Sequence, residues 1–154
     1  MTYSVSRAAL EAFYEAYATH DTAKLAPMLH DDIEWIISGP VDVLNWCGTR
    51  RGKPAVIDLV DRVIPSLFRV VTFTRSSILM DGDQVATLNR LTARRCADDR
   101  VISFRLAHFM RFKDDKVIAN LSLIDSFDAV EQMLGHSLAV HHDELAMPSD
   151  LVAV

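Results

Sequence analysis

The chain has 154 residues, of which 50% are hydrophobic and 24% charged, with a formal net charge of -5 at pH 7. This length fits a single domain with a sizeable core, and the acidic balance argues against a broad nucleic-acid surface, which needs clustered Lys and Arg. No apolar run approaches the roughly 20 residues that span a bilayer, and the N-terminal segment has no secretory apolar region, so we expect a cytoplasmic protein that binds neither nucleic acid nor membrane.

The first part of the chain is predicted to form two helices and a short strand. Apolar residues recur at helical spacing over about residues 4–20 and predict an amphipathic first helix. They are Leu10, Phe13, Tyr14, Tyr17 and Ala18. Asp21 is an N-cap for a short second helix that reaches Leu29. The apolar segment 33–37, which contains Trp35 and ends at a Ser-Gly-Pro breaker, predicts a strand.

The second part predicts a helix followed by a meander of strands. After a loop that contains Trp46, Pro54 opens a third helix at a position where its missing N–H costs little. The buried side of this helix is expected to carry Ile57, Val60, Ile64 and Leu67. From there the pattern changes to strands, with an Asp-Gly hairpin signal at Asp81. Four long antiparallel strands are predicted at 70–80, 84–95, 101–112 and 117–124.

The end of the domain is marked by a short closing helix. Asp128 and Glu131 stand in capping-box spacing and Gly135 is placed to end the helix. We therefore expect one domain over residues 1–135 and a C-terminal extension over 136–154. The fold class is α+β, with three N-terminal helices covering a curved mixed or antiparallel sheet of one short and four long strands. Such a sheet forms a half-open, cone-shaped barrel.

This order of elements resembles the nuclear-transport-factor-2-like, or cystatin-like, superfamily and its branch of SnoaL-like and ketosteroid-isomerase-like proteins. The likeness covers about residues 5–135. It is carried by the first helix running into His20-Asp21, LHDDIEW at 29–35, RGKPAV at 51–56, HFMRFKDDKV at 108–117 and IDSFD at 124–128. The resemblance implies a pocket between sheet and helices, and frequently a homodimer through the outer sheet face. It does not imply one activity, because members include cyclases, isomerases, dehydratases, epoxide hydrolases and non-catalytic domains.

The resemblance transfers catalytic residues only in part. The catalytic Tyr, general-base Asp and protonated Asp of the steroid isomerases align with Phe13, Ile37 and Ala107. That mechanism therefore lacks its polar groups in this chain. The Arg and the strand-end Asp of epoxide hydrolases of the limonene type align with Arg90 and Asp125, but their second Asp aligns with Thr92. SnoaL-like cyclases use a late-strand Asp as acid/base, and Asp125 is similar in position.

Asp125 is the first catalytic candidate. It continues an alternate-residue series that is apolar, namely Val117, Ala119, Leu121 and Leu123. A carboxylate on a buried face needs a hydrogen bond or a raised pKa, and a raised pKa would suit proton transfer near neutral pH. The alternative is that Asp125 only braces the following turn and helix.

His108 is the second catalytic candidate, since it is the polar member of an apolar alternate series over 102–112. An imidazole in the pocket could polarise a carbonyl or relay a proton. Ala107, however, aligns with a pocket position of the isomerases, and alternation would then place His108 on the outer face at a dimer interface. Both placements stay open at this point.

Two kinds of residue are candidates for ligand binding. If the strand faces that carry Arg90 and Arg105 form a pocket wall, a guanidinium there could bind a carboxylate or enolate oxygen; surface ion pairs are the alternative. Aromatic area for a flat ligand is supplied by Tyr14, Tyr17, Trp35 and Trp46. Trp46 could form a lid, while such aromatic stripes otherwise pack in the core.

No cofactor or metal is expected. The chain has no glycine-rich phosphate loop, and Cys47 and Cys96 are too far apart for a zinc motif, so we expect reduced thiols. The C-terminal residues His136, His141, His142, Asp143 and Glu144 resemble metal ligands in composition but not in spacing.

The leading hypothesis is a homodimeric protein that binds a small apolar or aromatic carbonyl-type molecule. If it is an enzyme, cofactor-free acid/base chemistry of the polyketide-cyclase or isomerase type is expected at Asp125, helped by His108 or Arg105. The alternative is a non-catalytic ligand-binding or protein-interaction domain. A further alternative is an epoxide hydrolase, which requires a water between Asp125 and Arg90.

Overall fold

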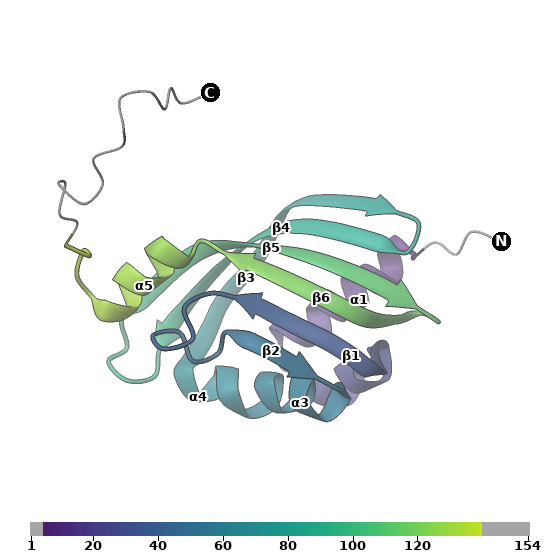
Figure 1. Cartoon of the computed structure of the whole chain (residues 1–154), viewed down its shortest axis with the longest axis horizontal. Coiled ribbons are helices and arrows are strands. Elements are labelled where there is room, and N and C mark those ends of the chain that lie inside the picture. Colours follow the sequence, from purple (N-terminus) through teal and green to yellow (C-terminus); the bar gives the residue numbers. More distant parts are fainter. Residues whose placement is uncertain (1–4, 140–154) are drawn as a thin grey trace, which may run out of the picture.

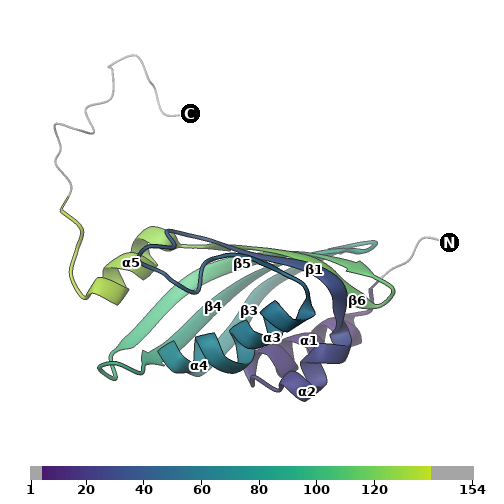
Figure 2. The ribbon, with the colours of Figure 1, turned by 60° about the horizontal axis from the view of Figure 1, so that its bottom comes forward.

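A six-stranded curved sheet with helices packed on its inner face forms the domain in the computed structural model, which describes residues 5–139 (Figure 1). The strand order is β2-β1-β6-β5-β4-β3. Neighbouring strands are antiparallel except β1 and β6, which are parallel. Figure 2 shows α1, α3 and α4 lying along the hollow side of the sheet. The predicted α+β class with a cone-like mixed sheet is confirmed.

The N-terminal helices begin at caps that the sequence supplies. α1 (Arg7–Ala18) starts after Ser6, whose hydroxyl accepts a hydrogen bond from the backbone N–H of Ala9 at 3.1 Å. Asp21 caps α2 (Thr22–Leu25) in the same way. A short 3-10 turn, η1 (Ala26–Met28), contains a proline and leads into the sheet. The two predicted helices are therefore present.

The first two strands differ from expectation. The predicted strand 33–37 lies within β1 (Leu29–Ser38), which is longer because it pairs with both β2 and β6. The strand β2 (Gly48–Arg51) was not predicted. Its sequence, Gly-Thr-Arg-Arg, has no apolar alternation, and it is held in the sheet by pairing with β1 at the edge.

The third predicted helix is one helical segment interrupted by a wider turn. It consists of α3 (Lys53–Asp58), the π-helical η2 (Leu59–Val63) and α4 (Ile64–Leu67). Pro54 stands in the first turn of α3, as expected. Pro65, which cannot donate a backbone N–H, is the second residue after the π-helical turn.

The predicted antiparallel meander is confirmed. It consists of β3 (Phe68–Asp81), β4 (Gln84–Arg95), β5 (Val101–Lys113) and β6 (Lys116–Ile124). Gly82, with φ 58, takes the left-handed conformation that the first hairpin turn needs. The closing helix α5 (Ser126–Leu134) begins two residues earlier than predicted and ends at Gly135, whose φ is 81.

The alternation of β5 decides which side chains face the interior. Every second residue of this strand is buried, and these are Ile102, Phe104, Leu106, His108, Met110 and Phe112. His108 therefore faces inward, while Arg105 and Ala107 face outward. The alternative placement of His108 on the outer face was wrong, because Ala107 is the residue that lies there.

The alternation of β6 was also predicted wrongly in its second half. Its buried residues are Val117, Asn120 and Ser122, so the inward positions change parity beside an irregularity in the pairing with β5. Leu121 and Leu123 are consequently exposed, at 37% and 44%. The face that leads to Asp125 is therefore the outer face rather than a buried one.

Three further expectations concern the chain as a whole. None of the helices within residues 5–139 is long and apolar enough to cross a membrane. Both cysteines are free thiols, with Cys47 buried and Cys96 exposed. Of the predicted extension 136–154, residues 140–154 lie outside the described part of the chain.

Candidate functional site

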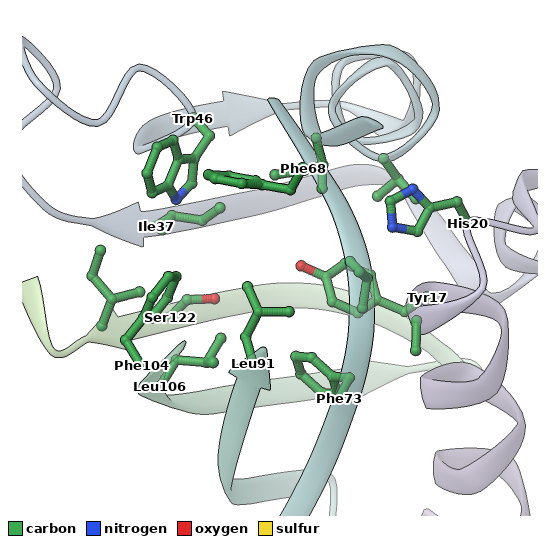
Figure 3. Close-up of a pocket in the computed structure, with 15 residues that line it drawn as sticks. Tyr17, His20, Ile37, Trp46, Phe68, Phe73, Leu91, Phe104, Leu106 and Ser122 are labelled. Atoms are coloured by element: carbon green, nitrogen blue, oxygen red, sulfur yellow. The ribbon is translucent and has the colours of Figure 1, made fainter. Parts of the chain in front are cut away.

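A small apolar cavity lies between the inner face of the sheet and the helices (Figure 3). The centre of a water-sized sphere can occupy about 60 Å³ of it. Its apolar wall is formed by Ala18, Ile37, Trp46, Val60, Ile64, Phe68, Val70, Phe73, Leu91, Phe104, Leu106 and Ile124. Three residues with more polar side chains complete it, namely Tyr17, His20 and Ser122. The space exceeds what one water needs and is smaller than a typical drug-sized pocket.

Tyr17, in the last turn of α1, places a hydroxyl group in this apolar space. Figure 3 shows the hydroxyl pointing toward the middle of the cavity. It makes no hydrogen bond to another residue of the described range 5–139. Burial raises the pKa of Tyr17 to about 12, with Arg50 acting weakly in the opposite direction. The hydroxyl is therefore protonated at neutral pH and acts as a hydrogen-bond donor rather than as a base.

His20 lies on the same side of the cavity, just after α1 ends. Its backbone is left-handed, with φ 57, which turns the chain from α1 toward α2. Burial lowers the pKa of His20, and a hydrogen bond with the backbone of Val60 partly opposes this. The imidazole is consequently neutral near pH 7 and can accept a proton. Sequence reasoning missed this role, although His20 stood in one of the segments that carried the resemblance.

Trp46 closes the cavity on the opposite side. Its ring meets that of Phe68 edge to face, with centroids 4.9 Å apart, and only 4% of the residue is exposed. The carbonyl oxygen of Trp46 accepts a hydrogen bond from Arg50 Nη1 at 2.9 Å. These contacts make Trp46 a fixed part of the wall. Of the four aromatic residues predicted to contact a ligand, Tyr17 and Trp46 line the cavity.

His108, Tyr14 and Trp35 lie in the core behind the cavity. The Nδ1 atom of His108 is 2.9 Å from the Tyr14 hydroxyl oxygen, and the two rings are stacked at 5.8 Å. Complete burial lowers the pKa of His108 to about 4, so its ring is neutral at pH 7. Trp35 packs against Tyr17 with ring centroids 5.6 Å apart. These three residues support the cavity from behind.

Asp125, Arg105 and Arg90 lie outside the cavity, on the outer side of the sheet. Asp125 precedes α5, its side chain is 36% exposed, and its Oδ2 atom is 3.4 Å from Arg105 Nη2. Arg90 Nη1 lies 3.4 Å from the hydroxyl oxygen of Ser103. The predicted pocket wall carrying both arginines is therefore not part of this cavity, because their strand positions face outward. The acid/base role of Asp125 stays a prediction for a site on that outer surface.

The three positions that align with isomerase catalytic groups have different locations. Phe13 is buried in the core, Ile37 lines the cavity and Ala107 faces outward. Ala107 was aligned with a pocket position of the isomerases, but the residue of β5 that faces the interior is its neighbour His108. The interior does contain hydroxyl groups from α1, but they belong to Tyr14 and Tyr17.

Metal-ligating residues do not gather in the part of the chain that the structure describes. Within residues 5–139, no three His, Cys, Asp or Glu side chains are close enough together to hold an ion. His141, His142, Asp143 and Glu144 lie outside the described residues.

Comparisons with known proteins identify what the chain is similar to. The sequence model described as "SnoaL-like domain" matches residues 10–120. A solved structure of a protein from Rhodopseudomonas palustris, proposed to be an isomerase, is 30% identical, with a TM-score of 0.77, and the match covers 83% of this chain and 97% of that one. A comparison with curated protein sequences gives no match.

Two more distant structures share the fold. An NTF2-like protein from Burkholderia thailandensis E264 is 21% identical, with a TM-score of 0.70, over 82% of this chain and 95% of that one. An epoxide hydrolase of the LEH-like type from M. tuberculosis is 19% identical, with a TM-score of 0.66, over 83% and 88%. At this level of identity the likeness concerns the fold alone.

Proposed function

Since this chain belongs to the SnoaL-like domain family, and the matched region contains most of the cavity wall, we propose that the cavity binds a small, largely apolar or aromatic carbonyl compound. The observation that carries the proposal is the Tyr17 hydroxyl, a protonated donor without a hydrogen-bond partner among residues 5–139, directed into an apolar space. A carbonyl oxygen accepts such a hydrogen bond, and the rest of the ligand would contact the apolar wall.

The same arrangement supports cofactor-free acid/base chemistry. A hydrogen bond from Tyr17 would stabilise the negative charge that develops on the carbonyl oxygen when a neighbouring carbon loses a proton. His20, neutral near pH 7, would take that proton and return it to the same carbon or to another one. Proton removal and return of this kind underlie isomerisation and cyclisation reactions.

Binding is tested with two molecules that differ only in the carbonyl group, acetophenone and ethylbenzene. The dissociation constant of each is measured by NMR titration for the natural protein and for Tyr17→Phe. One net hydrogen bond contributes about 0.5–1.5 kcal/mol, so acetophenone is expected to bind roughly three- to tenfold more tightly than ethylbenzene. In Tyr17→Phe this preference should disappear while ethylbenzene still binds. An unchanged preference in the variant would contradict the role of Tyr17.

Catalysis is tested separately from binding. The methyl group beside the carbonyl of acetophenone exchanges hydrogen for deuterium in D₂O when a base removes its protons, and NMR follows this exchange. The proposal predicts a rate above that of buffer for the natural protein, and a loss of this acceleration in His20→Gln. Binding without acceleration would favour the second candidate, a non-catalytic ligand-binding domain, which the small size of the cavity also supports.

Homodimer formation is the proposed use of the outer sheet face. Exposed apolar side chains gather there on three neighbouring strands, and they are Leu88, Phe109, Leu121 and Leu123. Phe109 lies directly opposite Leu121 in the pairing of β5 with β6. A group of exposed apolar side chains of this kind is typical of a protein interface. Asp125 and Arg105 lie at its edge, so an epoxide-hydrolase or acid/base role of Asp125 would operate at this surface.

A further inference from the structure

A group of polar side chains is buried behind the cavity on the inner face of the sheet. We call it the interior polar cluster, and its members are Tyr14, Trp35, Thr87, His108 and Asn120. None of them is more than 3% exposed. Thr87 lies directly opposite His108 on β4, and Asn120 lies directly opposite Trp35 on β1. Burying polar groups is costly unless they are hydrogen-bonded, so their partners define what the cluster can do.

A chain of hydrogen bonds fixes one side of the His108 ring. Asn89 Nδ2 donates to Thr87 Oγ1 at 2.9 Å, and the Tyr14 hydroxyl lies 2.6 Å from Thr87 Oγ1 and 2.9 Å from His108 Nδ1. When Thr87 donates to Tyr14 and Tyr14 donates to Nδ1, both hydroxyl hydrogens have acceptors within the chain. With the Asn89 amide oriented so that Nδ2 faces Thr87, the opposite direction leaves the Thr87 hydrogen without an acceptor. The chain therefore favours the tautomer with the hydrogen on Nε2 of His108.

Three atoms of the cluster have no hydrogen-bond partner within residues 5–139, namely Trp35 Nε1, His108 Nε2 and Asn120 Oδ1. Trp35 Nε1 and His108 Nε2 are donors, and Asn120 Oδ1 is an acceptor. A buried polar atom left unpaired costs about 1–3 kcal/mol. Together the three atoms are complementary to a group that accepts two hydrogen bonds and donates one.

The three residues are neighbours in space. The rings of Trp35 and His108 are 6.3 Å apart, and Asn120 is paired with Trp35 across the parallel strands. Asn120 also lies diagonally from His108, because Ser122 is the residue opposite His108. Since Nδ1 of His108 is bonded to Tyr14, Nε2 points away from Tyr14, on the other side of the ring.

The cluster adjoins the cavity through two shared contacts. Ser122 lines the cavity, and its hydroxyl oxygen accepts a hydrogen bond from Asn120 Nδ2 at 2.9 Å. Tyr17 also lines the cavity, and its ring meets that of His108 edge to face at 5.9 Å. The three unpaired atoms therefore belong to residues that lie directly behind this part of the cavity wall.

We propose that Trp35, His108 and Asn120 form a binding site for an uncharged hydroxyl group. Its oxygen accepts hydrogen bonds from Trp35 Nε1 and His108 Nε2, and its hydrogen is donated to Asn120 Oδ1. Both a water molecule and a hydroxyl of the cavity ligand have this chemistry. The ligand part of the inference rests on the proposed function, and it narrows the ligand class to small neutral molecules that carry a hydroxyl group.

The surroundings of the site oppose charged ligands. Its three residues are uncharged at neutral pH, and complete burial keeps the His108 ring neutral. Arg75, a cation beside the cluster, lies over the Tyr14 ring at 4.6 Å and is paired with Glu11. A carboxylate would lose its hydration without gaining an opposite charge, and it could not donate to Asn120. The site therefore distinguishes an alcohol from an acid of similar size.

The test uses 1-phenylethanol beside acetophenone and ethylbenzene, which share its skeleton. The ketone oxygen only accepts hydrogen bonds, so only the alcohol can donate to Asn120. Dissociation constants are measured by NMR titration for the natural protein, for Asn120→Leu and for the matched control Asn45→Leu, whose exposed side chain is on the loop after β1. Asn120→Leu should weaken binding of the alcohol roughly three- to tenfold relative to ethylbenzene and leave the ketone-to-ethylbenzene ratio unchanged. Asn45→Leu should leave both ratios unchanged.

The outcomes separate this inference from the proposed function. If neither ethylbenzene nor acetophenone binds the natural protein, the proposed function fails and the ligand site fails with it. If both bind but the alcohol ratio is the same in Asn120→Leu as in the natural protein, the ligand part of this inference is overturned while the proposed function stands. Should Asn120→Leu not fold, Trp35→Phe, which removes the indole N–H, is expected to lower the same ratio.

A ligand-free crystal structure tests the site with water as its occupant. A water oxygen bonded to at least two of the three atoms supports the site. A direct hydrogen bond from Trp35 Nε1 or His108 Nε2 to Asn120 Oδ1, after a side-chain rotation, would overturn it because no atom would be left to bind a hydroxyl.

Discussion

His108 and Ser122 lie directly opposite each other on β5 and β6, and both face the interior with at most 1% of their surface exposed. Because Ser122 lines the cavity, this pairing places His108 and the interior polar cluster next to the cavity. It also fixes the neighbouring residues of both strands on the outer face. The functional account therefore concerns the hollow side of the sheet, while Asp125 belongs to the outer side.

The first prediction concerns the pH dependence of stability. The pKa of His108 is about 4 when folded and about 6.5 when unfolded, so the unfolded chain binds more protons between these values. The contribution of neutral His108 is thus fully present above pH 6.5 and is lost progressively as the pH falls to about 4, by at most roughly 3 kcal/mol. Urea unfolding of the natural protein and of His108→Phe, at pH 8, 6.5, 5 and 4, measures the difference. Parallel pH profiles of the two proteins would contradict the buried, neutral ring.

The second prediction compares two tyrosines of α1. Tyr14→Phe removes the hydroxyl that joins Thr87 to His108, and it should lower the free energy of unfolding by about 1–3 kcal/mol. Tyr17→Phe removes a hydroxyl with no hydrogen bond within residues 5–139 and should change it by less than about 0.5 kcal/mol. Chemical denaturation of both variants tests this. Equal losses would mean that the two hydroxyls have similar surroundings.

The third prediction concerns the cavity wall. Trp46→Ala should cost about 3–5 kcal/mol, because a large buried side chain packed on Phe68 is replaced by a cavity. Phe127→Ala is the matched control, since Phe127 is 55% exposed and should cost far less. Thermal or urea unfolding gives both values. A loss at Trp46 as small as that at Phe127 would favour a mobile lid over a fixed wall.

The fourth prediction tests the proposed dimer. Phe109→Asp places a charge in the middle of the exposed apolar face and should convert the dimer to a monomer. Val41→Asp is the control, because Val41 is 52% exposed on the loop after β1, outside the sheet. Light scattering after size-exclusion chromatography gives the mass of each variant. A natural protein that is monomeric at high concentration would refute this use of the face.

Much of the fold could be predicted because its long elements carry clear periodicity. The four meander strands and their Asp-Gly turn follow directly from the apolar runs, and Gly135 ends the closing helix as its left-handed φ requires. The edge strand Gly48–Arg51 could not be found in the same way. Its four residues have no apolar side chains to form a pattern, and they join the sheet by pairing with β1.

The candidate site was harder to predict because polar residues occupy inward positions. In β6 the polar residues Asn120 and Ser122 face inward, while the apolar residues Leu121 and Leu123 are exposed. The alternation of apolar residues therefore predicted a buried face that ends at Asp125, on the wrong side of the strand. The parity changes beside an irregularity in strand pairing, which a period of two cannot describe. The proposed role of His20 depends on the turn after α1, which brings its ring to the cavity. No local sequence pattern predicts that this ring lies beside residues of distant strands.

The central claim is that ligand binds inside the cavity, and NMR of methyl groups tests it most directly. Acetophenone is titrated into protein labelled at leucine and isoleucine methyl groups. The account predicts shifts at Ile37, Ile64 and Leu91, which line the cavity, and none at Leu88, Leu121 and Leu123 on the outer face. Shifts confined to the three outer leucines, next to Asp125, would contradict the account.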